Sequence, residues 1–186
     1  IAVALAAQNV LGDLLASLSI VLDKPFVVGD MVVTGSEKGT VEHIGIKTTR
    51  LRSISGEQLI LSNKDLLESR VQNFKRMEQR RVVQNFGITY STSADQIEQI
   101  PEMIKKIVEK HDKLKFDRCH FSAYGASSLD FEFVFFVLDP DYNTFMDLKE
   151  KILLEIFREF QSRKIEFAFP TQTIYIEKMP ARDISQ

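Results

Sequence analysis

The 186-residue sequence has a single cysteine, Cys119, so it cannot form an internal disulfide framework. A lone thiol is typical of proteins from a reducing compartment. An excess of positive charge is also missing, because 24 lysines and arginines stand against 26 aspartates and glutamates. The resulting net charge of −2 argues against a protein whose main surface binds nucleic acid.

Patterns that carry catalysis or bind metal are missing as well. The three histidines, His43, His111 and His120, do not have the spacing of a local metal site. Cys119 and His120 do not form a nucleophilic dyad, because adjacent residues of a strand point to opposite faces. The sequence contains no glycine-rich phosphate loop, no GxSxG motif and no HExxH motif. We therefore predict no enzyme, no metal site and no cofactor.

The longest apolar stretch opens the sequence. Residues Ile1–Leu22 carry one charge, Asp13, and a helix of this length would reach roughly 33 Å, about the hydrocarbon thickness of a bilayer. The stretch is too long for a signal peptide and lacks a basic leader. It also contains small residues that let helices pack closely: Ala2, Ala4, Ala6 and Ala7. Since the chain opens on Ile with this segment already under way, we expect it to be the C-terminal part of a longer protein.

One line of side chains along this helix changes from apolar to polar. Positions 1, 5, 9, 13 and 17 share a stripe that reads Ile, Leu, Asn, Asp and Ser. Such a stripe suits a helix that lines a space dry at one end and wet at the other. The alternative is an amphipathic helix whose small face packs on a soluble core. Three weak helix formers predict a bend in the middle of the run: Gln8, Asn9 and Gly12.

Residues Met31–Phe74 are predicted to form β-structure. Pro25 ends the preceding helix, and the short apolar runs that follow are separated by glycine-containing breaks. This spacing favours a small, strongly bent antiparallel sheet or barrel. Three side chains would face inward only if a bulge or bend near Gly45 shifts the alternation: Val41, Ile44 and Ile46.

A charged junction follows, and then a second β/α region. The junction is either a solvated linker or a basic lip that attracts anions, and its basic residues are Lys75, Arg76, Arg80 and Arg81. The second region has the order β-α-β-β-α-β of a ferredoxin-like domain. We predict strands at Val82–Tyr90, Arg118–Tyr124, Leu129–Leu138 and Thr171–Glu177, and helices from Ser93 to about Lys110 and from Asn143 to about Ser162.

Two features of the predicted helices are local. Ser93 is a candidate N-cap with Gln96 three residues later, which is a capping-box pattern. Pro101 should kink the first helix or mark a later start. In the second helix the apolar positions predict a buried side: Met146, Ile152, Leu153, Ile156, Phe157 and Phe160.

Several short motifs follow one another in a fixed order along nearly the whole chain, from Ile1 to about Lys178. They are Leu5–Gln8, Asp13–Ser17, Lys24–Phe26 with Gly29 and Asp30, Gly39–Val41, Thr48–Arg52, Leu61–Asn63, Asn73 with Phe74, Gly125–Ser128, and Phe169 with Pro170. In order and spacing they resemble the small-conductance mechanosensitive channels of bacteria. The chain departs from that pattern at Asn9, where a glycine is common, and at Ser62, where a proline is frequent.

The resemblance implies an α+β chain of defined parts. These are a pore-lining transmembrane helix (1–24), an Sm-like small β-barrel domain (25–75), a basic linker (76–81), a ferredoxin-like domain with a C-terminal barrel strand (82–179) and a tail (180–186). It also implies a homo-oligomer, a heptamer in the familiar members, that binds no nucleic acid. The helix would lie in the inner (plasma) membrane, and the other domains would form a cage in the cytoplasm.

The resemblance further implies roles for particular residues. Ile1 and Leu5 would form the apolar rings of the pore constriction, and Gln8 with Asn9 would mark the bend. The last strand would join the copies in a parallel barrel through Thr171, Thr173, Ile174, Tyr175 and Ile176. Lys75, Arg76, Arg80 and Arg81 would line the side openings of the cage and favour anions.

These expectations predict a tension-gated, weakly selective ion channel that releases small solutes on hypo-osmotic shock. Its partners would be the lipid bilayer and the permeating ions and solutes. The alternative is a soluble oligomeric protein of Sm-like and ferredoxin-like domains that binds a ligand or RNA, and near-neutral charge speaks against its RNA-binding form. The soluble alternative also leaves the apolar stretch Ile1–Leu22 unexplained.

Overall fold

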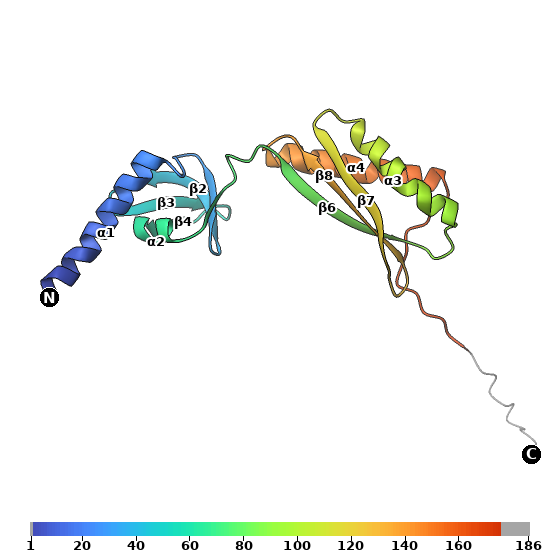
Figure 1. Ribbon diagram of the computed structural model, residues 1–186, viewed down its shortest axis with the longest axis horizontal. Helices are drawn as coiled ribbons and strands as arrows, with labels where there is room; N and C mark the ends of the chain where they lie inside the picture. The colour runs from blue at the N-terminus through green and yellow to red at the C-terminus, as the bar shows by residue number, and fades with distance from the viewer. Residues whose placement is uncertain (1, 176–186) are drawn as a thin grey trace, which may run out of the picture. The chain divides into compact units, whose positions relative to one another are not determined.

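The computed structural model describes the backbone of residues 2–175 and the side chains from Leu11 onward. The chain forms two compact units, which are shown in Figure 1. The first unit contains the described residues up to Arg80 together with Asp139–Tyr142, and the second contains Arg81–Leu138 and the described residues from Asn143 on. Each unit combines helices with an antiparallel sheet, so the α+β class predicted from the sequence is confirmed.

The first unit joins one long helix to a five-stranded sheet. Its elements are α1 (Ala2–Asp23), β1 (Met31–Thr34), β2 (Glu37–Ile44), β3 (Thr48–Ser53), β4 (Gln58–Ser62), α2 (Asn63–Glu68) and β5 (Val71–Asn73). The strands lie in the order β4-β3-β2-β1-β5. Among the described residues, no helix has the length and apolarity that crossing a membrane requires. The helix predicted at the start of the chain is therefore present, and its transmembrane character is not confirmed.

The core of the first unit is small and draws on both helices and the sheet. Its buried apolar residues are Ile20, Phe26, Val32, Val41, Leu51 and Leu66. Gly39 permits the close approach of β2 and β3, because a Cβ added there would lie 2.6 Å from the carbonyl oxygen of Arg52. This steric limit gives a physical reason for the Gly39–Val41 motif.

The predicted bulge in this sheet is present, but it lies earlier than expected. The pairing of β2 with β3 shifts register between Val41 and His43, ahead of Gly45. Val41 is buried and Ile44 packs partly buried against the core, whereas Ile46 is 72% exposed, so the inward position that depended on a bulge near Gly45 does not hold for Ile46. Because β2 ends at Ile44, Ile46 lies in the turn and no longer follows the alternation of the strand.

Helix α2 was not predicted from the sequence. Ser62 caps it, since the Ser62 side chain accepts a hydrogen bond from the backbone N–H of Asp65. A serine followed three residues later by an acidic residue is a recognisable start signal. Ser62, the residue that departs from the proline of the channel family, therefore has a local structural role.

The second unit packs two helices against one face of a sheet. Its elements are β6 (Arg80–Ile88), α3 (Ala94–Glu109), β7 (Leu114–Tyr124), β8 (Leu129–Val137) and α4 (Tyr142–Ser162). The sheet order is β6-β8-β7. Both helices contribute to one apolar core with β8, which supplies Phe131, Phe133 and Phe135. The capping box of Ser93 and Gln96 is confirmed, and α3 runs through Pro101 as one helix.

The segment around Phe167 lies beside β6, at the position where the sequence predicts a fourth strand beginning at Thr171. Phe167 forms an antiparallel bridge with Ile88 of β6. Two backbone hydrogen bonds flank it, from Thr89 N to Glu166 O (3.0 Å) and from Ala168 N to Gly87 O (2.9 Å). The described residues 171–175 do not take this position, so the place predicted for them in the sheet is wrong, while their pairing between copies stays a prediction. Pro170 follows directly after the paired segment and has no N–H to continue the pairing.

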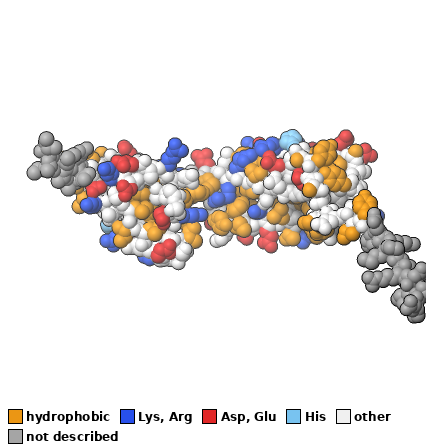
Figure 2. Space-filling view, turned by 90° about the horizontal axis from the view of Figure 1, so that it is seen from below, with side chains coloured by type: hydrophobic (Ala, Val, Ile, Leu, Met, Phe, Trp, Pro, Cys, Tyr) orange, Lys and Arg blue, Asp and Glu red, His pale blue; other side chains and the backbone are white. Residues whose placement is uncertain are grey.

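Helix α4 buries a narrower stripe than its sequence indicates. Ile152, Ile156 and Phe160 are buried at intervals of four residues, as predicted. Three residues also expected to be buried are instead 41–46% exposed, and they are Met146, Leu153 and Phe157. Because the buried stripe is one residue wide, Leu153 and Phe157, one position further round the helix, lie outside it. On the face drawn in Figure 2, apolar side chains reach the surface of both units.

The Gly125–Ser128 motif forms the turn between β7 and β8. Gly125 N donates to Ser128 O (2.7 Å), and Ser128 Oγ donates to Asp130 Oδ1 (2.6 Å). A Cβ added at Gly125 would lie 2.6 Å from Ser128 Oγ, and one added at Gly87 of β6 would lie 2.7 Å from Ser128 Cβ. Two glycines therefore leave the space that the Ser128 side chain occupies.

Candidate functional site

The predicted constriction falls where the structure gives no side-chain detail. Ile1 lies outside the described residues. The backbone is helical from Ala2 on, but six predicted pore-helix side chains also lie outside the described part: Ala2, Ala4, Leu5, Ala6, Gln8 and Asn9. Gly12 is described, and α1 runs through it as one helix from Ala2 to Asp23. The candidate site that can be built from contacts is therefore the junction between the C-terminal half of α1 and the sheet of the first unit.

In this half, α1 separates a packed face from an open one. Ala16 and Ile20 are buried at 7% and 1% exposure, and α1 lies against α2. Gly12 continues the same stripe, because a Cβ added there would come within 3.9 Å of the Lys64 side chain. The opposite face exposes large apolar side chains, which are Leu11, Leu14, Leu15, Leu18, Val21 and Leu22. A face of this kind is suited to contact lipid or another protein surface.

An ion pair joins α1 to the turn between β2 and β3. The Nζ of Lys47 lies 3.6 Å from Oδ2 of Asp13, whose side chain is 16% exposed. Asp13 is the only charged residue in the apolar stretch Ile1–Leu22. Its charge is directed at the first unit's own sheet, where Lys47 is 73% exposed in its side chain. An ion pair this exposed on one side adds little stability, so its value lies in orientation.

The turn that carries Lys47 is held by a buried hydrogen-bond network. Thr49 and Asn63 are fully buried. Thr49 Oγ1 donates to Asn63 Oδ1 (2.7 Å), and Asn63 Nδ2 donates to Gly45 O (2.8 Å). The backbone N–H of Asn63 donates to Lys47 O (3.0 Å). Since buried polar groups are costly unless paired, this network fixes the turn and with it the backbone of Lys47.

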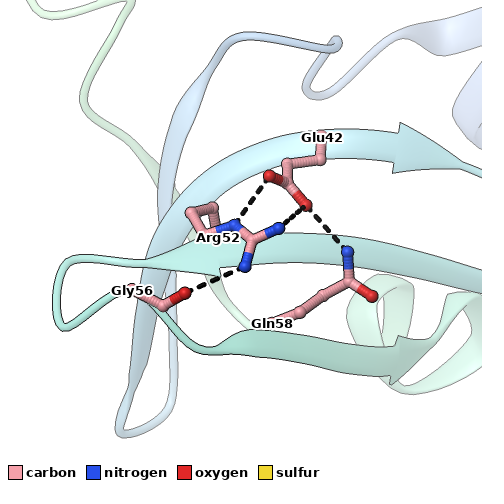
Figure 3. Close-up of polar contacts among 4 residues, drawn as sticks. All are labelled: Glu42, Arg52, Gly56 and Gln58. Carbon is pink, nitrogen blue, oxygen red and sulfur yellow. Dashed lines mark hydrogen bonds and ion pairs between the residues drawn. The ribbon is translucent and has the colours of Figure 1, made fainter.

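A second polar network ties three strands together on the exposed face of the sheet (Figure 3). Glu42 of β2 accepts from Arg52 Nε (2.7 Å) and Nη2 (3.1 Å) of β3, and from Gln58 Nε2 (2.8 Å) of β4. Arg52 Nη1 also donates to Gly56 O (2.9 Å) in the β3–β4 turn. The hydrogen bonds from Arg52 and then Gln58 lower the pKa of the Glu42 carboxyl. Arg52 belongs to a motif of the sequence, yet its partner Glu42 was not anticipated.

The four basic residues of the predicted cage opening differ in surroundings. Lys75 and Arg81 have exposed side chains. Arg76 donates from Nη2 to the carbonyl oxygen of Lys24 (2.6 Å), at the end of α1. Arg80 begins β6, and its guanidinium carbon lies 5.7 Å from the ring centroid of Tyr142. Their role at a side opening stays a prediction.

The terminal segment predicted to assemble the copies is exposed where it is described. Ile174 and Tyr175 are 76% and 90% exposed, and residues 171–175 have no regular structure. Ile176 lies outside the described residues. Exposed apolar side chains on a strand-like sequence without a partner fit an interface segment, which no contact in the structure tests.

Two features of the described residues bear on reactivity, namely the grouping of possible metal ligands and the environment of the Cys119 thiol. Within that part of the chain, no His, Cys, Asp and Glu side chains gather into a group that could hold a metal ion. Cys119 is buried on β7, and this burial raises the pKa of its thiol to about 12. A thiol with so high a pKa is a poor nucleophile near neutral pH.

Comparison with known families matches both units. Residues 9–76 match the family described as "Mechanosensitive ion channel, beta-domain", and residues 82–167 match "Mechanosensitive ion channel MscS, C-terminal". Among curated proteins, the small-conductance mechanosensitive channel MscMJ of Methanocaldococcus jannaschii is 37% identical over 179 residues, covering 96% of this chain and 51% of that protein. The low conductance mechanosensitive channel YnaI of Escherichia coli is 25% identical, covering 96% of this chain and 53% of that protein.

Solved structures show the same fold. The closed-state crystal structure of Helicobacter pylori MscS superposes with a TM-score of 0.76 at 23% identity, covering 96% of this chain and 70% of that one. Arabidopsis thaliana MSL1 A320V gives a TM-score of 0.83 at 21% identity, covering 91% of this chain and 65% of that one. The chain spans about half the length of the curated relatives it matches.

Proposed function

The chain belongs to the MscS family of mechanosensitive ion channels, and from this membership we propose that it forms the pore and cytoplasmic cage of a tension-gated, weakly selective ion channel. The channel releases small solutes on hypo-osmotic shock. The observation that carries the proposal is the order of the parts: a long helix with an open leucine face leads directly into two units that match this family in sequence. Family membership favours the channel over the soluble ligand- or RNA-binding alternative, and it favours a protein that is not an enzyme.

The proposed gate is a narrow apolar neck. Rings of Ile1 and Leu5 from several copies exclude water, so ions meet a dewetting barrier. Membrane tension favours the state that occupies more area in the membrane, and opening is therefore a population shift between two states. Small side chains allow neighbouring pore helices to slide past one another, and these are Ala2, Ala4 and Ala6.

The proposed assembly is a homo-oligomer, a heptamer, in the inner (plasma) membrane with both units in the cytoplasm. Two groups of exposed apolar side chains support contact between copies. One runs along α4 and includes Met146, Leu153 and Phe157. The other is the terminal segment with Thr171, Thr173, Ile174, Tyr175 and Ile176, whose described apolar members are exposed. Basic residues at the side openings, Lys75, Arg76, Arg80 and Arg81, favour anions.

The experiment that tests the channel is patch recording of the complete protein in liposomes under stepped suction. Unitary currents that appear only under suction support the proposal, and a folded, inserted protein that stays silent rejects it. Leu5→Ser tests the gate: a polar ring rewets the neck and lowers the suction threshold. Leu5→Ile keeps the ring apolar and serves as the control. An unchanged threshold in Leu5→Ser at normal expression would remove Leu5 from the gate.

A further inference from the structure

The C-terminal end of α1 is held by a segment more than fifty residues away in sequence. The last four carbonyl groups of a helix have no partner within the helix. After α1 ends at Asp23, Lys24 adopts a left-handed conformation with φ +47°. Its N–H still bonds to Ile20 O (3.0 Å), while its own carbonyl oxygen accepts from Arg76 Nη2 (2.6 Å). A guanidinium at this position also complements the partial negative charge of the helix end.

Asn73, at the end of β5, holds the next residues of the same connection. Its Nδ2 donates to Pro25 O (3.3 Å) and to Oδ2 of Asp30 (2.7 Å). Asp30 is 5% exposed, and the same Oδ2 accepts from Val27 N (3.1 Å). One buried carboxylate and one amide therefore link the residues that follow α1 to those that follow β5.

We name these two sets of contacts together the exit clamp. It consists of Lys24, Pro25 and Asp30 on the side of α1, and of Asn73 and Arg76 on the side of β5. Asn73 Oδ1 accepts from Lys75 N (3.0 Å), so the amide also shapes the chain that leads to Arg76. A non-glycine residue with φ > 0 is strained and persists only where its surroundings determine it. Lys24 meets this condition through the exit clamp.

We propose that Arg76 and Asn73 are positioning residues that fix the C-terminal end of α1 to the sheet. Channel opening then bends α1 on the N-terminal side of the clamp instead of tilting the whole helix. This inference rests on the proposed function. Between the predicted bend and the clamp, α1 also packs on its own unit through Ala16 and Ile20, which are buried. The bend is therefore confined to Gly12 and the residues before it, where the weak helix formers Gln8 and Asn9 stand.

The expected change in the suction threshold follows from whether α1 must deform when the channel opens. While the C-terminal end of α1 is fixed, its N-terminal half can move outward only if the helix deforms. Once the clamp is released, the packing of Ala16 and Ile20 alone holds the C-terminal half of α1, so the helix tilts more easily and less deformation is needed. Loss of Arg76 should therefore lower the suction at which the channel opens.

The test uses the complete protein with Arg76→Gln, Arg76→Lys and the control Arg70→Gln, which removes another exposed guanidinium of the same unit. Hydrogen exchange of amides 20–30 measures the clamp without any channel activity. This hydrogen bond is exposed, so it contributes less than a buried one, and amides 20–30 of Arg76→Gln should exchange about two- to fivefold faster. Arg76→Lys, which keeps one donor and the charge, should fall between, and Arg70→Gln should match the wild type.

Patch recording of the same variants then tests the consequence. The inference holds if Arg76→Gln opens at lower suction than both the wild type and Arg70→Gln. It is overturned if exchange in Arg76→Gln equals that of the wild type, or if exchange rises while the threshold stays the same. A wild-type protein that never opens under suction would instead reject the proposed function, while the exchange data would still decide whether the clamp exists.

Discussion

Different kinds of interaction stabilise the interior of each of the two units. The first unit has a small apolar core and contains every described polar residue that is buried: Asp30, Thr49 and Asn63. The core of the second unit is apolar and rich in phenylalanine. Directional hydrogen bonds fix the turns of the first unit and the end of α1, whereas close packing fixes the second. The first unit, which would transmit movement from α1, thus relies on hydrogen bonds that can break one at a time. The second unit relies on apolar packing, in which neighbouring side chains support one another.

The largest effect should come from removing a ring of the second unit's core. Phe133 is 1% exposed and stacks on Phe135 with centroids 5.8 Å apart. Phe133→Ala should lower the free energy of unfolding of this unit by about 3–5 kcal/mol, because it removes buried area and leaves a cavity. Hydrogen exchange of the complete protein resolves the units separately. Faster exchange in the first unit as well would show that the two do not behave as separate cores.

A smaller effect is expected for the buried amide of the first unit. Asn63→Ala leaves the Thr49 hydroxyl and the Gly45 carbonyl without their partner and should cost about 1–3 kcal/mol. The loss should be confined to amides of β2, β3 and α2. Asn85→Ala, at an exposed position of the second unit, is the matched control. Equal exchange in the two variants would contradict the view that polar contacts hold the first unit.

The thiol of the second unit provides a test by pH. Burial raises the pKa of Cys119 from 9.0 to about 12. In the unfolded chain the thiol ionises near its ordinary pKa, while in the folded unit it stays protonated, so the stability it contributes is complete below pH 9 and is lost as pH rises toward 12. Denaturant unfolding of wild type and Cys119→Ala between pH 8 and about 11 measures this loss. Parallel pH profiles would contradict it.

The smallest effect should come from the exposed network of the first unit. Hydrogen bonds from Arg52 and Gln58 lower the pKa of Glu42, so the stability it contributes is present above its ordinary pKa of 4.5 and is lost as pH falls below that value. Because the groups are exposed, Glu42→Gln should shift the denaturation midpoint only slightly at pH 7, and added salt should shrink the shift. A shift as large as that of Asn63→Ala would erase the distinction between buried and exposed polar contacts.

Local signals in the sequence predicted most of the elements. Pro25 marks the end of α1, the pair Ser93 and Gln96 marks the start of α3, and the strand at Leu129 is among the most apolar segments of the chain. Helix α2 carried a usable signal in Ser62 and Asp65 that was not recognised. The errors fell where local pattern gives no information: TQTIY has the composition of a strand, but the segment at Phe167 occupies the edge of β6 instead.

The site was less predictable than the fold. Arg76 and Lys24 lie 52 residues apart, and nothing in either neighbourhood indicates the other. The basic neighbours of Arg76 suggest a basic lip and do not indicate that its guanidinium also binds a backbone carbonyl. The bulge between Val41 and His43 likewise depends on how two strands pair. Contacts of this kind arise from tertiary structure, so residue types and spacing cannot specify them.

The space around Ser128 has an evolutionary consequence. A methyl group at Gly87 would meet Ser128 Cβ at 2.7 Å, and one at Gly125 would meet Ser128 Oγ at 2.6 Å. Position 87, which is distant in sequence, thus shares one small volume with positions 125 and 128 of the β7–β8 turn. In descendants of this protein, a larger residue at 87 should be accepted only after position 128 has become glycine, because alanine would keep the Cβ atom that clashes. Mutational histories that reverse this order should be rare, because their intermediate would have to displace the β7–β8 turn.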